Sequence, residues 1–184
     1  RVFIPAGTFL QPSKEGQAAL TALVLKYLGE TSGKIADLFC GVGTFSYPLA
    51  QKPGNRVLAV DASKELLEGF KNSVNRQMIA NIEIVCRNLF KYPLEGAELE
   101  GLAAVVFDPP RAGAKEQAAR LAALPAGKRP RKLIAVSCNP ETFARDAEIL
   151  QNGGYRLCEV TPVDQFVYTS HCELVALFVD EGLL

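Results

Sequence analysis

One cysteine of the chain, Cys138, occupies a position suited to chemistry. It follows an apolar run at residues 132–137 that predicts a buried strand, and it precedes a helical pattern at residues 140–151. The partial positive charge of a helix N-terminus favours a thiolate over a thiol. Cys138 is therefore a candidate nucleophile, although the ordinary role of a single cysteine is to pack as a small apolar side chain.

Two acids also stand at the ends of predicted strands. Asp108 closes an apolar run and is followed by two prolines, which cannot extend a strand and so predict a rigid turn at the edge of the sheet. Glu173 opens the apolar run 174–179, where an acid is either exposed to solvent or a general base in a cleft. His171, the only histidine, is either a hydrogen-bonded structural residue or a group that titrates near neutral pH.

The segment 37–45, with the sequence DLFCGVGTF, predicts a cofactor loop after the first strand. Gly41 lets the backbone approach a ligand closely at the carboxyl edge of a parallel sheet. Ser46 stands where a dinucleotide-binding loop has its third glycine, and Asp37 suits a positively charged methionine moiety better than a pyrophosphate. Asp61 ends the second strand, where it would accept hydrogen bonds from ribose hydroxyls. These residues favour S-adenosylmethionine over a nicotinamide cofactor.

The elements that must position these residues alternate between apolar strands and amphipathic helices. Strands are predicted at residues 35–39, 56–61, 82–87, 103–108, 132–137, 155–163 and 172–179, and helices at 14–28, 64–77, 114–123 and 140–151. The first five strands are apolar along their length, as strands covered on both faces are. The last two have no helix between them, which predicts an antiparallel hairpin.

The predicted fold class is therefore α/β, with a doubly wound, mostly parallel seven-stranded sheet and a C-terminal antiparallel hairpin. This is the Rossmann-like type of sheet found in S-adenosylmethionine-dependent methyltransferases. We expect residues 1–30 to form an N-terminal segment and lead-in helix on the core, and residues 31–184 to form the catalytic domain. The chain starts without a methionine, so we also expect it to be a fragment of a longer protein.

Charge and cysteine content limit the function classes. The 184 residues carry a formal net charge of zero, whereas proteins that hold nucleic acid usually show a basic excess. A neutral chain argues against RNA binding by this domain alone. The five cysteines are odd in number and lack Cys-x-x-Cys spacing, which excludes a disulfide framework and a zinc site and predicts a cytoplasmic protein. No apolar run reaches the roughly 18 residues of a membrane span.

Five segments of the chain, in this order, closely resemble the RNA 5-methyluridine methyltransferases that act on tRNA and on 23S ribosomal RNA. They are FLQPS at 9–13, DLFCGVGTF at 37–45, FDPPRAG at 107–113, VSCNPETFARD at 136–146 and TSHCELVALF at 169–178. The resemblance spans nearly the whole chain, and the combination of its SCNP and HxE motifs is specific. It implies transfer of a methyl group from S-adenosylmethionine to carbon 5 of a uridine in RNA.

The resemblance also implies a role for each matching position. Cys138 is the implied nucleophile, which adds to carbon 6 of uracil, and Glu173 is the implied general base for the proton on carbon 5. Together with Gly41 of the glycine turn, the implied cofactor site comprises Gln11, Phe39, Thr44, Asp61, Asn88 and Asp108, and Asp108 also faces the target base. Many members have Asn where Thr44 stands, which leaves that contact open.

Members of this family usually carry an N-terminal RNA-binding domain and a central domain, and some carry an iron–sulfur cluster. None of that sequence is present in these 184 residues, and their cysteines do not suit such a cluster. We therefore expect no metal here, an RNA substrate, and an RNA-binding domain outside this chain.

Three other functions remain open on the sequence alone. The first is a nicotinamide-dependent oxidoreductase on the same kind of sheet. The second is a non-catalytic module that binds RNA or the cofactor, although a dead copy need not keep both Cys138 and Glu173. The third is methyl transfer to a small molecule or to an amine of a base. Methyltransferases of base amines have an aromatic residue after the two prolines, whereas this chain has Arg111.

Overall fold

The computed structural model describes residues 14–164 and 172–183, so that Gln11 and His171 lie outside the described residues. The helices are α1 (Lys14–Leu28), α2 (Ser46–Gln51), α3 (Lys64–Arg76), α4 (Lys115–Ala122) and α5 (Pro140–Asn152), and the strands are β1 (Lys34–Leu38), β2 (Arg56–Asp61), β3 (Ile82–Cys86), β4 (Ala104–Phe107), β5 (Lys132–Ser137), β6 (Tyr155–Val163) and β7 (Glu173–Asp180). Every predicted strand and helix is confirmed, with each end within one residue of its predicted position.

The seven strands form one sheet in the order β3-β2-β1-β4-β5-β7-β6. The first five of these pair in parallel, whereas β7 runs antiparallel to both β5 and β6. The predicted doubly wound sheet and its C-terminal hairpin are thereby confirmed. The last strand of the chain lies inside the sheet, between β5 and the edge strand β6.

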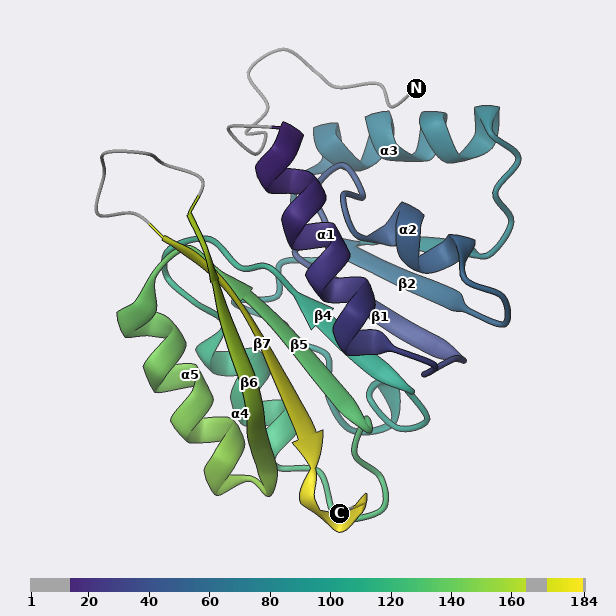
Figure 1. The fold of residues 1–184 in the computed structure, drawn as a ribbon. Coiled ribbons are helices and arrows are strands. Elements are labelled where there is room, and N and C mark those ends of the chain that lie inside the picture. The colour runs from purple at the N-terminus through teal and green to yellow at the C-terminus, as the bar shows by residue number, and fades with distance from the viewer. Residues whose placement is uncertain (1–13, 165–171, 184) are drawn as a thin grey trace.

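Helices cover both faces of the sheet, as Figure 1 shows, because its central strands are apolar on both faces. On β5, Ile134 belongs to a core cluster with residues of α1 and α2, whereas its neighbour Leu133 belongs to a cluster with residues of α4 and α5. Ile35 and Ala36 of β1 divide in the same way. Neighbouring residues of one strand therefore pack against helices on opposite faces, which gives a three-layer α/β/α architecture.

Helix α1 is tied to the sheet at its C-terminal end. The Lys132 ammonium donates hydrogen bonds of 2.9 and 3.0 Å to the carbonyls of Tyr27 and Leu28, which are among the last carbonyls of the helix. The Tyr27 hydroxyl lies 2.6 Å from that of Thr161 on β6. The described part of the N-terminal region therefore packs as one layer of the domain.

The short helix α2 was absent from the prediction. It has six residues, contains a proline and has no side-chain cap on its N-cap residue Phe45. A pattern of that length carries too little periodicity to be detected. Its placement matters nevertheless, because it begins directly after the glycine loop.

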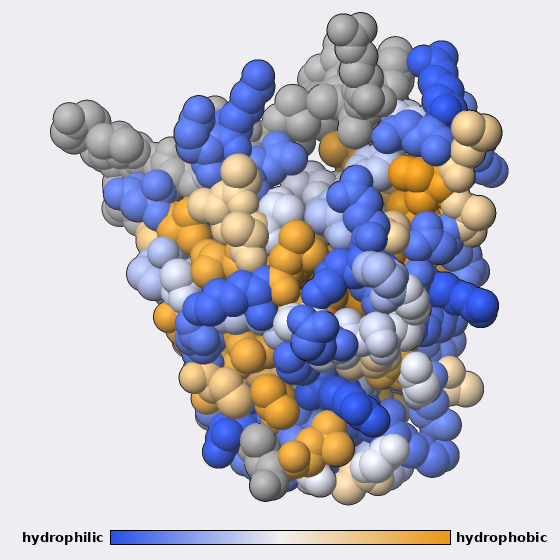
Figure 2. All heavy atoms as spheres, turned by 45° about the vertical axis from the view of Figure 1, so that its right-hand side comes forward, coloured by the Kyte–Doolittle hydropathy of each residue, from blue (hydrophilic) through white to orange (hydrophobic). Residues whose placement is uncertain are grey.

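The outer surface carries no extended apolar area on the face that Figure 2 presents, where hydrophilic side chains surround smaller hydrophobic patches. Within the described residues, no helix is long and apolar enough to cross a membrane. The exposed large hydrophobic residues of the described chain include Phe90 and Tyr92, in the loop after β3.

Candidate active site

The antiparallel pairing of β5 and β7 brings Cys138 and Glu173 together. Ser137 is paired with Leu174 in this ladder, and the same register continued by one residue places Cys138 opposite Glu173. Residues directly opposite in an antiparallel pair have β-carbons about 4.5–5.5 Å apart. Glu173 therefore lies beside the Cys138 thiol, although α5 and β6 separate the two residues in the sequence.

Asp108 joins this pair from the neighbouring strand. It follows β4, and its backbone amide donates a 3.2 Å hydrogen bond to the carbonyl of Leu38 at the end of β1. The prolines then turn the chain away from the sheet, as predicted. Three titratable groups from the ends of three strands therefore meet at one edge of the sheet.

Burial disfavours the charged forms of all three groups, and Glu173 further disfavours those of Cys138 and Asp108. Burial raises the pKa of the Cys138 thiol, and the carboxyl groups of Glu173 and Asp108 raise it further, while Arg111 acts in the opposite direction. Burial also raises the pKa of Glu173. Burial together with the charge of Glu173 raises the pKa of Asp108 to about 8.

This finding differs from the expectation that the helix after Cys138 favours the thiolate. Asn139 is the N-cap of α5, and its side chain accepts a 3.0 Å hydrogen bond from the amide of Glu141. Cys138 therefore lies one residue outside the cap, where the helix acts weakly because its field falls off within the first turn. Burial and the two acids outweigh it.

The glycine loop is held in a strained conformation. Phe39 has a φ of 61°, in the left-handed region that residues with a β-carbon rarely adopt. Gly43 has a φ of 87°, and a β-carbon there would lie 2.5 Å from the ring of Phe70 on α3. The loop therefore requires glycine at this position, and α3 packs directly beneath it.

Asp61 connects the loops that follow β1 and β2. Its Oδ2 atom accepts a 2.9 Å hydrogen bond from the amide of Gly41, and its Oδ1 atom accepts one of 2.8 Å from the amide of Ser63. Each carboxylate oxygen can accept more than one hydrogen bond, so the side chain keeps capacity for a ligand.

Asp37 does not face the pocket as the sequence suggested. It is fully buried, and the Ser46 hydroxyl at the start of α2 donates a 2.5 Å hydrogen bond to its Oδ2 atom. Burial raises the pKa of Asp37 to about 7. Its carboxyl group thus anchors the N-terminus of α2 beneath the glycine loop, because strand alternation turns it toward that face of the sheet.

These groups line a pocket of about 810 Å³ at the carboxyl edge of the sheet. It is lined by Phe39, Cys40, Gly41, Val42, Thr44, Phe45, Asp61, Ala62, Ser63, Leu66, Arg87, Leu89, Phe90, Asp108, Pro109, Pro110, Arg111, Cys138 and Glu173. Of the site residues expected from the sequence, Phe39, Gly41, Thr44, Asp61, Asp108, Cys138 and Glu173 therefore share one pocket, whereas Asn88 is not among the lining residues.

The loop after β3 adds residues that the sequence analysis did not single out. Phe90 is 44% exposed, and its ring lies 5.4 Å from that of Phe39, centroid to centroid. Asn88 shapes this turn, because its Oδ1 atom accepts hydrogen bonds of 3.0 and 3.3 Å from the amides of Phe90 and Lys91. The sequence signal that could have identified Phe90 as a pocket residue is its position just after a predicted parallel strand, at the carboxyl edge of the sheet.

Arg87 stabilises the same loop. Its guanidinium donates to the carbonyls of Tyr92 and Pro93 at 2.6 and 2.8 Å, and it pairs with Glu98. A loop held by so many contacts presents Phe90 at a defined place on the pocket wall.

The pocket suits S-adenosylmethionine in size and chemistry. Small-molecule sites commonly have volumes of about 300–1,000 Å³, with apolar walls and a few polar groups. Here the aromatic rings of Phe39 and Phe90 provide a wall for a flat purine, and Asp61 provides acceptors for ribose hydroxyls. The acidic edge at Asp108 and Glu173 favours a cation. Within residues 14–164 and 172–183, no group of three or more His, Cys, Asp or Glu side chains is arranged to hold a metal ion.

The fold and the pocket define the class of S-adenosylmethionine-dependent methyltransferases. The magnesium protoporphyrin IX methyltransferase of Synechocystis, for example, shares the fold with a TM-score of 0.68 at 19% sequence identity, over 90% of this chain and 80% of that chain. The tRNA (uracil-54, C5)-methyltransferase of Pyrococcus abyssi, solved in complex with S-adenosyl-L-homocysteine, is more similar. It has a TM-score of 0.79 at 31% identity, over 94% of this chain and 40% of that chain.

The chain belongs to the tRNA (uracil-5-)-methyltransferase family, whose model matches residues 3–180. An RNA methyltransferase of Brucella melitensis, described as uncharacterized, is 47% identical over 95% of this chain and 40% of its own length. The 23S rRNA (uracil(1939)-C(5))-methyltransferase RlmD of Pseudomonas entomophila is 36% identical over 94% of this chain and 37% of its own length.

These findings confirm the family resemblance and the cofactor, since S-adenosylmethionine is the cofactor that the family uses. They favour a methyltransferase over the nicotinamide-dependent oxidoreductase that the glycine loop alone left open. The chain spans about 40% of the length of the Brucella, Pseudomonas and Pyrococcus proteins.

Proposed function

We propose that the protein transfers a methyl group from S-adenosylmethionine to carbon 5 of a uridine in RNA, with Cys138 as the nucleophile and Glu173 as the general base. The single observation that carries the proposal is the β5–β7 register, which sets Cys138 opposite Glu173 on the wall of the cofactor pocket. Transfer to an amine or a hydroxyl needs no thiol at this place.

The chemistry of uracil explains why a thiol is useful. Carbon 5 is a weak nucleophile, but addition of the Cys138 sulfur to carbon 6 moves electron density onto carbon 5. The bound cofactor supplies the methyl group as an electrophile. Glu173 then takes the proton from carbon 5, the double bond re-forms, and the Cys138 sulfur leaves carbon 6 as a thiolate.

Glu173 has the surroundings of a general base. It is 4% exposed, and within the described residues its Oε2 atom is buried without a hydrogen-bond partner. A buried oxygen without a partner is costly unless a ligand or a proton supplies one. The raised pKa of this carboxyl group brings it closer to neutral pH, where a base works well.

We assign the cofactor subsites as follows. Asp61 accepts hydrogen bonds from the ribose hydroxyls, Gly41 lets the backbone approach the ligand, Thr44 lines the site, and Phe39 packs on the adenosyl group. Asn88 and Gln11 complete the assignment as expected from the family resemblance. Asp108 faces both the cofactor and the target base.

The proposed substrate is a uridine of tRNA or 23S ribosomal RNA, since relatives that act on each are similar to this chain. The net charge of zero leaves little electrostatic attraction for RNA phosphates. We therefore place the main RNA-binding surface in sequence outside these 184 residues. The target uridine reaches the pocket unpaired or flipped out of its stack. A reducing cytoplasm suits the five cysteines, all of which are free.

The test is the chemical identity of the product. The full-length protein is incubated with isotopically methyl-labelled S-adenosylmethionine and unmodified tRNA or 23S ribosomal RNA. The RNA is then digested to nucleosides for mass spectrometry. We expect label in 5-methyluridine, and its loss in Cys138→Ala. Label in a methylated adenosine or cytidine would contradict the proposal.

A further inference from the structure

The loop that joins β4 to α4, residues 108–114, is held against α5 by several side chains. The side chains of Asn139 and Thr142 each donate a 3.2 Å hydrogen bond to the carbonyl of Arg111. The Arg145 guanidinium donates one of 3.0 Å to the next carbonyl along the loop. Side chains of the N-cap and first two turns of α5 therefore hold this loop by hydrogen bonds. The first residues of the loop line the pocket.

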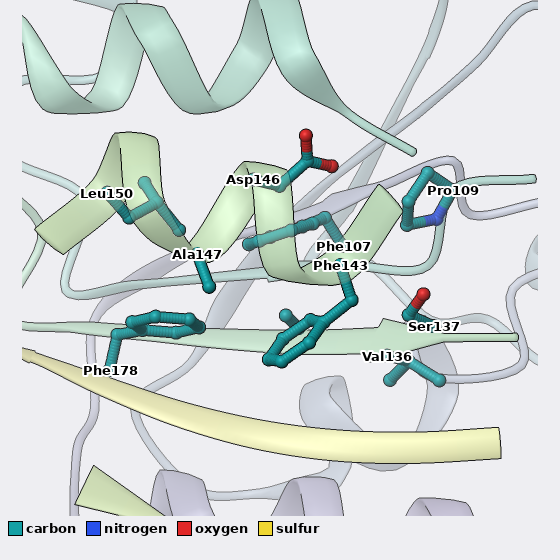
Figure 3. Close-up of a pocket in the computed structure, with 10 residues that line it drawn as sticks. Phe107, Pro109, Val136, Ser137, Phe143, Asp146, Ala147, Leu150 and Phe178 are labelled. Carbon is teal, nitrogen blue, oxygen red and sulfur yellow. The ribbon is translucent and has the colours of Figure 1, made fainter. Parts of the chain in front are cut away.

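Asp146 is the centre of this contact. It is 4% exposed, and its Oδ2 atom accepts a 2.6 Å hydrogen bond from the amide of Ala114, the N-cap residue of α4. Its Oδ1 atom receives two hydrogen bonds from Arg145, of 2.9 and 2.7 Å. Figure 3 shows the Asp146 carboxylate turned away from β5, whereas Phe143 of the same helix points toward the strand.

Gly113 allows this close approach. Its φ is 76°, and a β-carbon there would lie 2.5 Å from Nη2 of Arg145 and 2.7 Å from Oδ2 of Asp146. The loop backbone thus runs in direct contact with the two side chains. A buried carboxylate costs free energy unless it is fully hydrogen-bonded, and here both of its oxygens are used.

We propose that Asp146 is a positioning residue that fixes the loop 108–114 relative to Cys138. The loop delivers Asp108 and Arg111 to the pocket, and α5 starts directly after Cys138, so a contact between loop and helix sets the distances among all three groups. This inference rests on the proposed function, since it concerns the geometry in which the thiol meets its substrate. Asp146 does not line the pocket, so its effect must pass through the loop.

The first test measures the Cys138 thiol itself. Alkylation of Cys138 by iodoacetamide is followed across pH by peptide mass spectrometry, in the parent chain and in Asp146→Ala. Burial and the charge of Asp108 raise the pKa of the Cys138 thiol, and together they outweigh Arg111, which lowers it. Release of the loop hydrates the thiol and moves Asp108 and Arg111 away, so the pKa of Cys138 falls. We expect the midpoint of alkylation to move to lower pH. Asp146→Asn keeps the side-chain volume and one acceptor oxygen, so we expect a smaller shift of the alkylation midpoint in the same direction. This variant replaces Asp146→Ala in the test if the alanine variant does not fold.

The second test measures methyl transfer in a single turnover with the full-length protein. A misplacement of about 1 Å at a reacting group can cost about 100-fold in rate, so we expect Asp146→Ala to slow the transfer by at least about tenfold at saturating RNA and cofactor. Glu148→Ala, an exposed acid on the same helix, is the matched control and is expected to leave both readouts unchanged.

An unchanged alkylation midpoint in folded Asp146→Ala and Asp146→Asn would overturn the inference, as would an unchanged single-turnover rate. The proposed function fails in a different way, by an absence of methyl transfer in the parent protein. The alkylation midpoint still decides the role of Asp146 in that case, because it requires no RNA.

Discussion

Cys138 shares its pocket with two carboxyl groups, and this arrangement keeps its thiol protonated in the free protein. The raised pKa of this thiol has a chemical use, because a thiol that ionises only in the assembled site is protected from oxidation and unwanted alkylation. S-adenosylmethionine bound in this pocket would bring a positive charge into it, and that charge would favour the thiolate.

Replacement of Glu173 by Gln tests this electrostatic coupling. The charge of Glu173 raises the pKa of Cys138, so its removal lowers that pKa and the alkylation midpoint of Cys138 moves to lower pH. In the proposed mechanism Glu173 is also the base for the carbon 5 proton, and the Gln side chain cannot take that proton. With ordinary RNA and cofactor, we therefore expect a methylated protein–RNA adduct to accumulate, visible on a denaturing gel. Free turnover at the parent rate would contradict the assigned role.

Asp37 offers a second prediction, on stability. The folded protein keeps a proton on this carboxyl up to about pH 7, whereas the unfolded chain releases it near pH 4. The free energy of unfolding therefore falls as the pH rises from about 4 to about 7. Asp37→Asn keeps an acceptor for Ser46 and cannot ionise, so it flattens this fall in urea titrations. Glu68→Gln, an exposed acid on α3, serves as the control, and an equal flattening in both variants would refute the argument.

Several residue-level features were beyond prediction from the sequence. The motifs placed Asp61, Asp108, Cys138 and Glu173 at strand ends, because the carboxyl edge of a parallel sheet is a property of the pattern alone. The direction in which the pKa of Cys138 shifts was not predictable, since it depends on burial and on two acids that are distant in sequence. Asp37 was misplaced for a similar reason, because its partner Ser46 becomes a neighbour only when the loop closes.

At the scale of elements, the glycine loop depends on α3 beneath it. Gly43→Ala would bring a β-carbon against the Phe70 ring at a φ that alanine resists. We expect a loss of about 1–3 kcal/mol in the free energy of unfolding, and weaker cofactor binding in calorimetry.

The matched control for this variant is Gly101→Ala. Gly101 has a similar φ of 78°, but a β-carbon there would meet nothing within 4 Å. Gly101→Ala therefore has a backbone strain similar to that of Gly43→Ala, but its β-carbon does not collide with another side chain. Equal destabilisation of the two variants would show that contact with α3 is unimportant.

The helices and strands themselves were well predicted because apolar runs and helical periodicity are local signals. The helix predicted from residue 64 is an example, since the hydroxyl of the preceding Ser63 caps it by accepting a hydrogen bond from the amide of Leu66. The insertion of β7 between β5 and β6 is a long-range choice that no local pattern encodes. It is also the choice that brings Glu173 to the thiol.

At the scale of the whole molecule, one sheet edge gathers a cofactor loop, three acids and a thiol from five strands. The doubly wound order places the loops after β1, β2 and β3 on one side of the pocket and those after β4 and β5 on the other. The antiparallel hairpin then closes the second side. Because the chain carries no net charge, we propose that RNA recognition lies mainly outside these 184 residues.

The most direct measurement of the central claim is capture of the covalent intermediate. The full-length protein is incubated with S-adenosylmethionine and RNA in which uridine is replaced by 5-fluorouridine, and the mixture is resolved under denaturing conditions. Fluorine on carbon 5 cannot leave as a proton, so the intermediate accumulates. We predict an adduct whose RNA is attached to the peptide that contains Cys138, and its absence in Cys138→Ala. An adduct that persists in Cys138→Ala would contradict the assignment of the nucleophile.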